Sequence, residues 1–299
     1  MVLFRQMLVF FLLMLIGYYV ARKDVFDKQT CKKISWLVIN ICSPALVLHS
    51  ALDGDKVKGS TLLLVIGLAA AMYLVLMILG VCMPGILRRR SCSIYSPMTV
   101  FGNVGFMGYP LVLEMYGQTG LLYATLFNML YNLLFYTYGI SVISGEACDW
   151  KNLRKICNVG VCSVILAFIL YLLNLPAPTF LVQTLNSIGS LTGPLCMMMI
   201  GASFVGLRVR DLFSDLSLLL FTLIRFVVFP IVFFLIIRAF ITDSVILGVS
   251  LVMLAAPVGS MNLMLAQQYD GDVVTASKAI SLTTALSVIL LPLLSMILL

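Results

Sequence analysis

Phe101-Gly-Asn-Val-Gly-Phe-Met-Gly-Tyr-Pro-Leu111 lies in the middle of an apolar segment, residues 94–116, that is long enough to cross a bilayer as a helix. Its glycines weaken the helix interior, and Pro110 has no backbone N–H with which to continue the helix. Backbone groups left free at membrane depth are tolerated only where protein or a water-filled cavity surrounds them. The stretch therefore predicts a broken spanning helix, an element that membrane transporters use to hold their solutes.

A second break of the same kind lies 154 positions later, in Ala256-Pro-Val-Gly-Ser-Met-Asn262. In this register Asn103 aligns with Pro257. A glycine follows each break at the matching distance, Gly117 after the first and Gly271 after the second. Short apolar matches are common, so the joint coincidence of break, spacing and downstream glycine is what indicates an internal repeat.

The composition is that of an integral membrane protein. Of the 299 residues, 62% are hydrophobic and only 10% are charged, and the mean hydropathy is +1.12. A soluble domain, by comparison, has about a quarter of its residues charged. The eight cysteines form no Cys-x-x-Cys pair, and the single histidine, His49, cannot build a metal site with them. We therefore expect no metal, no cofactor and no catalytic residues.

Apolar runs of about 20 residues recur along the chain, and each is long enough to cross roughly 30 Å of hydrocarbon as a helix. They lie at 3–21, 34–52, 61–87, 94–116, 119–144, 155–174, 181–205, 216–240, 245–268 and 273–298. The sequence thus predicts an all-α membrane protein with ten transmembrane helices. The first run is not expected to be a cleaved signal peptide, because it lacks a small-residue cleavage site and continues directly into Arg22-Lys23.

The positive charges indicate how these helices are oriented. Thirteen lysines and arginines fall on one side of the ten-helix arrangement, at positions 22, 23, 28, 32, 33, 88, 89, 90, 151, 154, 155, 208 and 210. The opposite side collects Arg5, Lys56 and Lys58, with Arg238 near its edge. Because cytoplasmic loops are rich in lysine and arginine, both termini should be extracytoplasmic in a multi-pass protein of the plasma membrane. The net charge of +7 therefore reflects topology and not a nucleic-acid partner.

Five of the ten predicted helices fall in each half of the chain. The first repeat covers residues 1–144, a cytoplasmic linker covers 145–155, and the second repeat covers 156–299. Since five is odd, the second repeat must enter the membrane inverted relative to the first. The breaks then occupy matching positions in the fourth and ninth helices, a pattern typical of alternating-access transporters.

The two breaks supply most of the candidate substrate-binding residues. Asn103 is the strongest of them, because its amide offers two donors and an acceptor next to free backbone groups at mid-membrane. The competing interpretation is an asparagine that only packs helices together. Ser260 and Asn262 have the same two interpretations at the second break. The full predicted set consists of Gly102, Asn103, Gly105, Asn128, Pro257, Gly259, Ser260 and Asn262.

Arg225 and Lys278 are the two basic residues well inside the predicted helices, and Glu114 is the only acid within one. A charge at such a position usually has a function and a partner. Arg225 is nine residues into its helix, and it is a candidate counter-charge for an anion because arginine binds carboxylates through two hydrogen bonds. Glu114 and Lys278 are further candidate charge partners, but both lie nearer to helix ends. Their side chains are therefore also able to extend to the membrane surface.

These stretches resemble the auxin efflux carrier family, which includes the plant PIN-type carriers and bacterial organic-acid permeases. Residues 102–117 resemble the motif of the family's fourth helix, and residues 254–262 with 266–269 resemble its counterpart in the ninth helix. Residues 39–46 and 193–202 resemble the signatures of the second and seventh helices. The resemblance covers essentially the whole chain.

The resemblance implies a fold like that of the bile-acid/sodium symporters, in which the broken fourth and ninth helices cross beside the substrate. It places the family's crossover asparagine at Asn103 and its crossover proline at Pro257. It also implies a scaffold of helices 1, 2, 6 and 7 that forms a homodimer, and a transport domain of helices 3–5 and 8–10 that moves like an elevator. Small residues of the seventh helix, among them Gly201, should allow close helix contact in this dimer. Gly102 departs from the plant carriers, which have proline at this position, and this fits the bacterial branch and puts auxin in doubt as the substrate.

The leading hypothesis is a secondary transporter that moves a small organic anion, a mono- or dicarboxylate, across the lipid bilayer. A second hypothesis is a sodium-coupled symporter, for which Asn128, Thr283 and Thr284 offer oxygen ligands but no acid lies near them. A membrane-embedded enzyme would need a catalytic cluster that the chain does not offer, and the pair of broken helices favours alternating access over a channel. The coupling ion, H⁺ or Na⁺, is open at this point.

Overall fold

Helices fill the described parts of the chain. In the computed structural model these parts are residues 2–53, 58–87, 94–144, 159–173, 177–205, 215–269 and 271–298. The predicted linker 145–155 and the arginines at 88–90 lie outside them. Within the described residues the only β pairing is an isolated bridge between Gly102 and Val258. The predicted all-helical class is therefore confirmed for this part of the chain.

The chain divides into two compact units, which interleave along the sequence. Unit 1 comprises Met1–Leu63, Gly105–Met129 and Cys157–Gly206, and unit 2 comprises Leu64–Val104, Leu130–Ile156 and Leu207–Leu299. The helices of unit 1 are α1 (Val2–Arg22), α2 (Lys28–Leu37), the π-helical turn η1 (Val38–Cys42), α3 (Ser43–Asp53), α9 (Val159–Leu173), α10 (Thr179–Gly189) and α11 (Thr192–Ser203).

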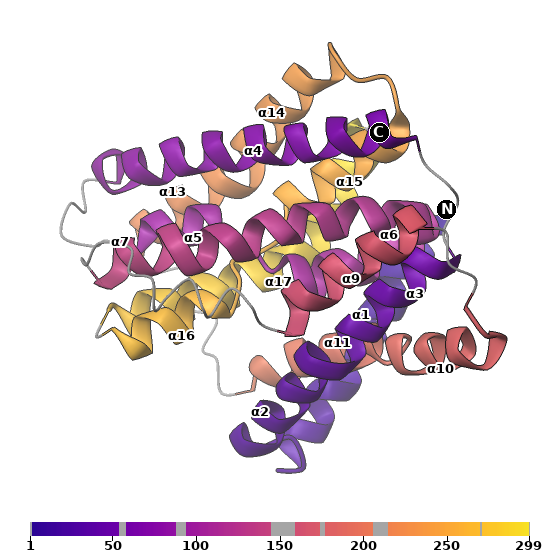
Figure 1. Ribbon diagram of the computed structural model, residues 1–299. Coiled ribbons are helices and arrows are strands. Elements are labelled where there is room, and N and C mark those ends of the chain that lie inside the picture. The colour runs from indigo at the N-terminus through magenta and orange to yellow at the C-terminus, as the bar shows by residue number, and fades with distance from the viewer. Residues whose placement is uncertain are drawn as a thin grey trace. The chain divides into compact units, whose positions relative to one another are not determined.

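Most helices of unit 2 come from the second half of the sequence. They are α4 (Gly59–Ile86, almost wholly in this unit), α5 (Tyr95–Val100), η3 (Phe135–Gly139), α7 (Ile140–Ser144), α13 (Leu216–Leu223), η4 (Ile224–Val228), α14 (Phe229–Arg238), α15 (Ser244–Leu254), α16 (Met261–Gln268) and α17 (Val273–Leu298). Two further elements, η2 (Val104–Gly108) and α6 (Tyr109–Leu134), each include residues of both units. Figure 1 shows all the α-helices with these labels.

Several of these helices are long and apolar enough to cross a membrane. Within the described residues five meet that test, at Gln29–Leu52, Gly59–Ile86, Val104–Ile143, Thr179–Ala202 and Leu216–Arg238. A sixth is added if the bent pair Val273–Ser287 and Ile289–Ser295 counts as one. Three shorter apolar helices lie at Leu8–Arg22, Val159–Tyr171 and Ser244–Leu254. The chain is thus a multi-pass helical protein, while the count of ten stays a prediction.

The longest of these segments, Val104–Ile143, is not one continuous helix. α6 has non-helical backbone angles at Gly117, with φ 64° and ψ −158°. A positive φ of this kind is easily adopted only by glycine. The break falls between the predicted fourth and fifth helices, 94–116 and 119–144.

Prolines are associated with the π-helical turns. η1 ends two residues before Pro44, η2 two residues before Pro110, and η4 two residues before Pro230. A proline ring collides with the carbonyl four residues earlier in an ordinary α-helix. That carbonyl lies within the wide turn in all three cases, so the helix continues past the proline. Only η3 has no proline after it, and it ends at Gly139.

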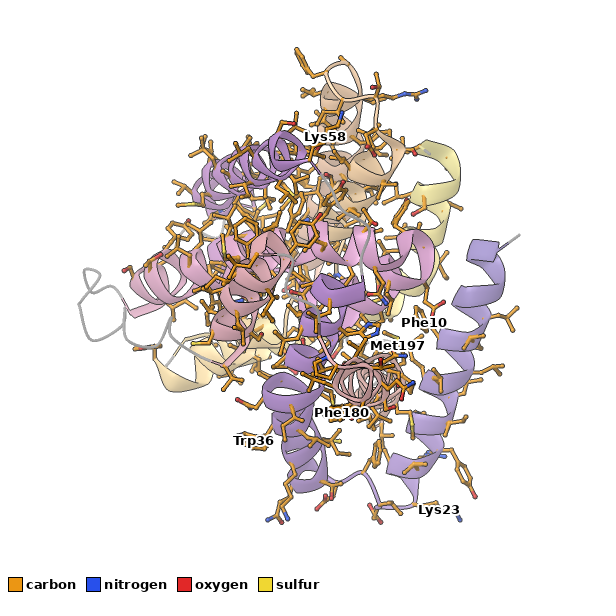
Figure 2. All side chains as sticks on the ribbon, turned by 45° about the vertical axis from the view of Figure 1, so that its right-hand side comes forward. Phe10, Lys23, Trp36, Lys58, Phe180 and Met197 are labelled. Atoms are coloured by element: carbon orange, nitrogen blue, oxygen red, sulfur yellow. The ribbon has the colours of Figure 1, made fainter. Side chains whose placement is uncertain are left out.

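In unit 1, α1 and α11 (both labelled in Figure 1) pack with their backbones in contact. A Cβ atom on Gly17 would lie 2.0 Å from the carbonyl oxygen of Met198, and one on Gly201 would lie 1.9 Å from that of Met14. Both glycines are therefore required by this contact. Figure 2 labels two other residues of these helices, Phe10 and Met197, which are both buried.

The close contact of α1 with α11 bears on the predicted homodimer. The sequence assigned the small residues of 193–203 to contact between two copies of the chain, but Gly201 is used within the chain, against α1. The dimer itself stays a prediction. It would have to use residues other than Gly201.

The core of unit 2 includes a residue of the second helix break. Its buried members come from α4, α5, α13, η4, α16 and α17, and Val258 of the break belongs to the same cluster. Among them Tyr95 and Phe221 have ring centroids 5.3 Å apart. Alanines 266, 276 and 279 form the contribution of α16 and part of that of α17, two helices that contact each other.

Aspartates begin four of the helices and account for a third of the acidic residues of the chain. Asp27, Asp215, Asp243 and Asp272 each accept a hydrogen bond from a backbone N–H in the first turn. This is the usual way to satisfy the free donors of a helix start. At the start of α2, hydrogen bonding from Thr30 lowers the pKa of Asp27 below its usual value. These acids therefore serve local structure.

Candidate functional site

The two helix breaks, residues 101–103 and 255–260, pair with each other in unit 2, and we refer to them as the paired breaks. Gly102 and Val258 form an antiparallel bridge. The Asn103 backbone N–H donates to the Pro257 carbonyl at 2.6 Å, and the Gly259 N–H donates to the Phe101 carbonyl at 3.0 Å. Asn103 and Pro257 are also the residues that the internal repeat aligns. The pairing satisfies backbone groups that each broken helix would leave free.

Two glycines allow the breaks to approach this closely. A Cβ atom on Gly259 would lie 2.9 Å from the carbonyl oxygen of Gly102, and one on Gly102 would lie 3.0 Å from that of Ala256. In both cases the obstacle is backbone, which cannot swing aside as a side chain can. Gly102 and Gly259, both predicted as site residues, therefore act here through the backbone pairing.

Phe101 anchors the first break with its side chain. Its fully buried ring makes edge contacts with Tyr131 and Phe135, at centroid distances of 5.3 and 5.2 Å. Tyr138 lies 6.4 Å away and shares a hydrogen bond of 3.0 Å with Ser96. Sequence reasoning missed this cluster, although the aromatic residues recur at intervals of four and three, as expected for one face of a helix.

Asn262 holds the two breaks together through its side chain. It is fully buried, and its Nδ2 donates to the Phe101 carbonyl at 2.8 Å and to the Gly259 carbonyl at 2.9 Å. Because both partners are carbonyl oxygens, which only accept hydrogen bonds, the amide atom that faces them is the nitrogen. Its Oδ1 has no hydrogen-bond donor among the described residues. A buried acceptor of this kind calls for a donor or a cation from elsewhere.

Thr283 of α17 supports the second break. The Val258 N–H donates to Oγ1 of Thr283 at 3.1 Å, and the same hydroxyl donates to the Ala279 carbonyl at 2.7 Å. The oxygen that the sodium hypothesis counted as a ligand thus already accepts one hydrogen bond. Its main role in the structure is to satisfy a backbone N–H of the break.

Asn103 and Ser260 present polar side chains that are not used in the pairing. Both residues are half-buried, and neither side chain forms a hydrogen bond with another described residue. Their backbone groups are bonded: the Asn103 N–H to Pro257, and the Ser260 carbonyl to the Leu263 N–H at 3.1 Å. The paired breaks therefore combine a fixed backbone with an amide and a hydroxyl that remain available to a ligand.

Arg225 in η4 is bound to the ends of two helices. It is 1% exposed, and its Nε donates to the Thr99 carbonyl while its Nη1 donates to the Leu254 carbonyl at 2.6 Å. Thr99 lies in the last turn of α5 and Leu254 ends α15. These are the helices that lead into the first and second breaks. The sequence offered Arg225 as a candidate counter-charge for a carboxylate, and in the structure its guanidinium donates to two backbone carbonyls.

The remaining predicted residues are spread over the two units. Gly105 and Glu114 belong to unit 1, and so does Asn128, which lies beside the hydroxyl of Tyr109. Glu114 is exposed. Lys278 belongs to α17 of unit 2 and is half-buried. None of these four takes part in the pairing of the breaks.

The described residues contain no group of three or more His, Cys, Asp or Glu side chains arranged to hold a metal ion. What they do contain, membrane-length helices and two paired breaks with unbonded polar side chains, defines a multi-pass membrane protein with a candidate solute site.

Comparison with known proteins identifies the family. A family model described as membrane transport protein matches residues 2–295, and the chain belongs to this family. The resemblance to the auxin efflux carrier family is thereby confirmed. An uncharacterized transporter of Methanocaldococcus jannaschii is 25% identical over 307 residues, covering 98% of this chain and 97% of that protein. One of Methanothermobacter thermautotrophicus is 26% identical over 300 residues, covering 96% and 95%.

Proposed function

We propose that this protein is a secondary transporter that carries a small organic anion across the plasma membrane and holds it at the paired breaks. The observation that carries the proposal is the combination of a fixed backbone with the unbonded side chains of Asn103 and Ser260. Transporter sites are built in this way because helix starts at the break offer N–H donors to an anion. α16 begins at Met261 and η2 at Val104, directly after the two breaks.

We also propose ten membrane helices in two inverted repeats, with the fourth and ninth crossing at the breaks. The antiparallel pairing supports this, because aligned residues oppose each other at Asn103 and Pro257, as a two-fold relation between repeats would require. Gly117 supports it further. The segment Val104–Ile143 has 40 residues, about 60 Å of helix, which is twice the thickness of the hydrocarbon, and Gly117 interrupts it.

The repeat also predicts the orientation of the chain, with both termini outside and the arginines at 88–90 in the cytoplasm. We expect a single cysteine placed at position 89 to resist a membrane-impermeant thiol reagent in intact cells. A single cysteine at position 56 should react readily. Labelling at 89 with none at 56 would reverse the orientation.

The division of the chain into two units supports the proposal of a fixed scaffold and a moving transport domain. Unit 1 contains the predicted helices 1, 2, 6 and 7, and unit 2 contains the paired breaks. Residues 105–129 of the predicted transport domain cluster with unit 1 instead, so the boundary differs from the simple scheme. A homodimer through the scaffold and an elevator-like movement are parts of the proposal.

Asn103→Ala is the test of the proposed site. We expect purified wild-type protein to be stabilised against heat by at least one acid of a panel of acetate, lactate, succinate and benzoate. Loss of one or two hydrogen bonds to a carboxylate should weaken that binding by roughly 10- to 100-fold in Asn103→Ala. The unfolding temperature without ligand should change little, because the side chain has no partner among the described residues.

The matched control for this test is Asn186→Ala, the same change at an exposed position of α10. It should bind like the wild type. Equal binding by the Asn103 and Asn186 variants would show that the anion is held elsewhere.

Sodium coupling is the second candidate, and one observation favours it. Oδ1 of Asn262 is a fully buried acceptor without a donor among the described residues, and a cation would satisfy it. Uptake into vesicles that depends on a sodium gradient would support coupling to sodium. Uptake driven equally well by a proton gradient in sodium-free buffer would exclude it.

A further inference from the structure

Arg225 lies at the two helix ends that lead into the paired breaks, so its charge affects the electrostatic potential there. Its guanidinium bonds both the last turn of α5 and the last residue of α15. The final carbonyls of a helix have no partner within the helix, and together they carry about half a negative charge. One buried cation thus caps the two negative helix ends that lead into the breaks. The planar fork of arginine allows one side chain to serve both.

The charge of Arg225 is not cancelled by an acid. Among the described residues no carboxylate forms an ion pair with it, and its guanidinium carbon lies 5.1 Å from the centroid of the Phe226 ring. The side chain is almost completely shielded from water, at 1% exposed. Its field therefore acts on its surroundings with little screening.

The helix ends of unit 2 at the breaks would sum to a negative charge without Arg225. α5 and α15 end there, with about half a negative charge each, and α16 starts there, with about half a positive charge. Adding a cation to the two negative ends neutralises them and leaves the positive end of α16 uncompensated. The result is a site with a net positive potential although no cationic side chain needs to touch the ligand.

We infer that Arg225 is a positioning residue that makes the paired breaks selective for anions by neutralising the C-terminal ends of α5 and α15. This deepens the proposed function and rests on it for the identity of the site as a solute site. It also explains why the guanidinium is committed to backbone carbonyls instead of facing a ligand. A purely structural cap would hold the breaks together without determining which charge they accept.

The potential at the breaks can be measured without a substrate. Asn103→Cys is introduced into protein whose eight native cysteines are replaced, and the thiol is reacted with two methanethiosulfonates of similar size, one anionic (sulfonatoethyl) and one cationic (trimethylammonioethyl). Restricted access slows both reagents, so the ratio of the two rates reports the local potential. With Arg225 present, this ratio should exceed that of a free thiol in the same buffer, because the anionic reagent is favoured.

Arg225→Gln should lower the ratio of anionic to cationic rates by about tenfold or more, since a full charge is removed at close range. Arg225→Lys, which keeps the charge, should preserve most of the ratio. Arg238→Gln, which removes the same charge at an exposed position of α14, should leave it unchanged.

An unchanged ratio in Arg225→Gln would overturn the inference. If that variant does not fold, the protein that keeps Arg225 still tests the inference. A ratio of anionic to cationic rates at position 103 below that of the free thiol would overturn the inference on its own. This measurement needs no transported acid, so its failure is separate from failure of the Asn103→Ala binding test.

Discussion

Gly259→Ala should destabilise the protein by about 1–3 kcal/mol and abolish substrate binding, because the new methyl group has no space between the breaks. A Cβ there lies 2.9 Å from the carbonyl oxygen and 3.2 Å from the carbonyl carbon of Gly102. Relief requires the backbones to separate. That separation would stretch the hydrogen bond from the Gly259 N–H to Phe101 and those made by Asn262.

The matched control is Gly105→Ala, at the position that the repeat aligns with Gly259. A Cβ on Gly105 meets nothing within 4 Å. Thermal unfolding in detergent should therefore show a clear loss of stability for Gly259→Ala and little or none for Gly105→Ala. Equal stability of the two variants would mean that the breaks do not pair as described.

Gly201→Ala should be at least as damaging to unit 1, with a loss of about 3 kcal/mol, the upper end of the usual range for overpacking. Its Cβ would lie 1.9 Å from the carbonyl oxygen of Met14, so α1 and α11 would have to separate along their contact. Gly67→Ala in α4 is the control, since nothing lies within 4 Å of a Cβ there.

Gly67→Ala should raise the unfolding temperature slightly, because alanine favours a helix by about 0.5–1 kcal/mol over glycine. The opposite signs of the two glycine-to-alanine changes make the comparison sharp. If Gly201→Ala is also neutral or stabilising, the two helices are farther apart than the structure places them.

The all-helical class and the long apolar helices could be predicted from the sequence, because a helix that crosses a bilayer needs a continuous apolar run. The first break could also be predicted, since Gly102 and Pro110 disrupt a helix wherever they occur. The alignment of Asn103 with Pro257 was read from the repeat, and the structure pairs these two residues. The breaks are thus encoded locally.

The partners of the site residues could not be predicted in the same way. Arg225 was recognised as a buried charge, but the sequence does not contain the information that two helix ends meet at its side chain. Asn262 and Thr283 satisfy backbone groups of the breaks, and this too depends on tertiary packing. The wide turns before the prolines could not be predicted either, because a proline shows that a helix is disturbed but not how the helix continues past it.

The pairing of the breaks has a consequence for biosynthesis. The Asn262 side chain bonds the Phe101 carbonyl across 161 positions of sequence. A ribosome adding about 5–20 residues per second needs roughly 10–30 s to produce the second break after the first. During this interval the first break has entered the membrane machinery with its backbone unsatisfied, and it must remain in contact with water or a helper protein. A nascent chain stalled before residue 255 would therefore display an unpaired polar segment at membrane depth, a signal by which quality control can distinguish incomplete from complete molecules.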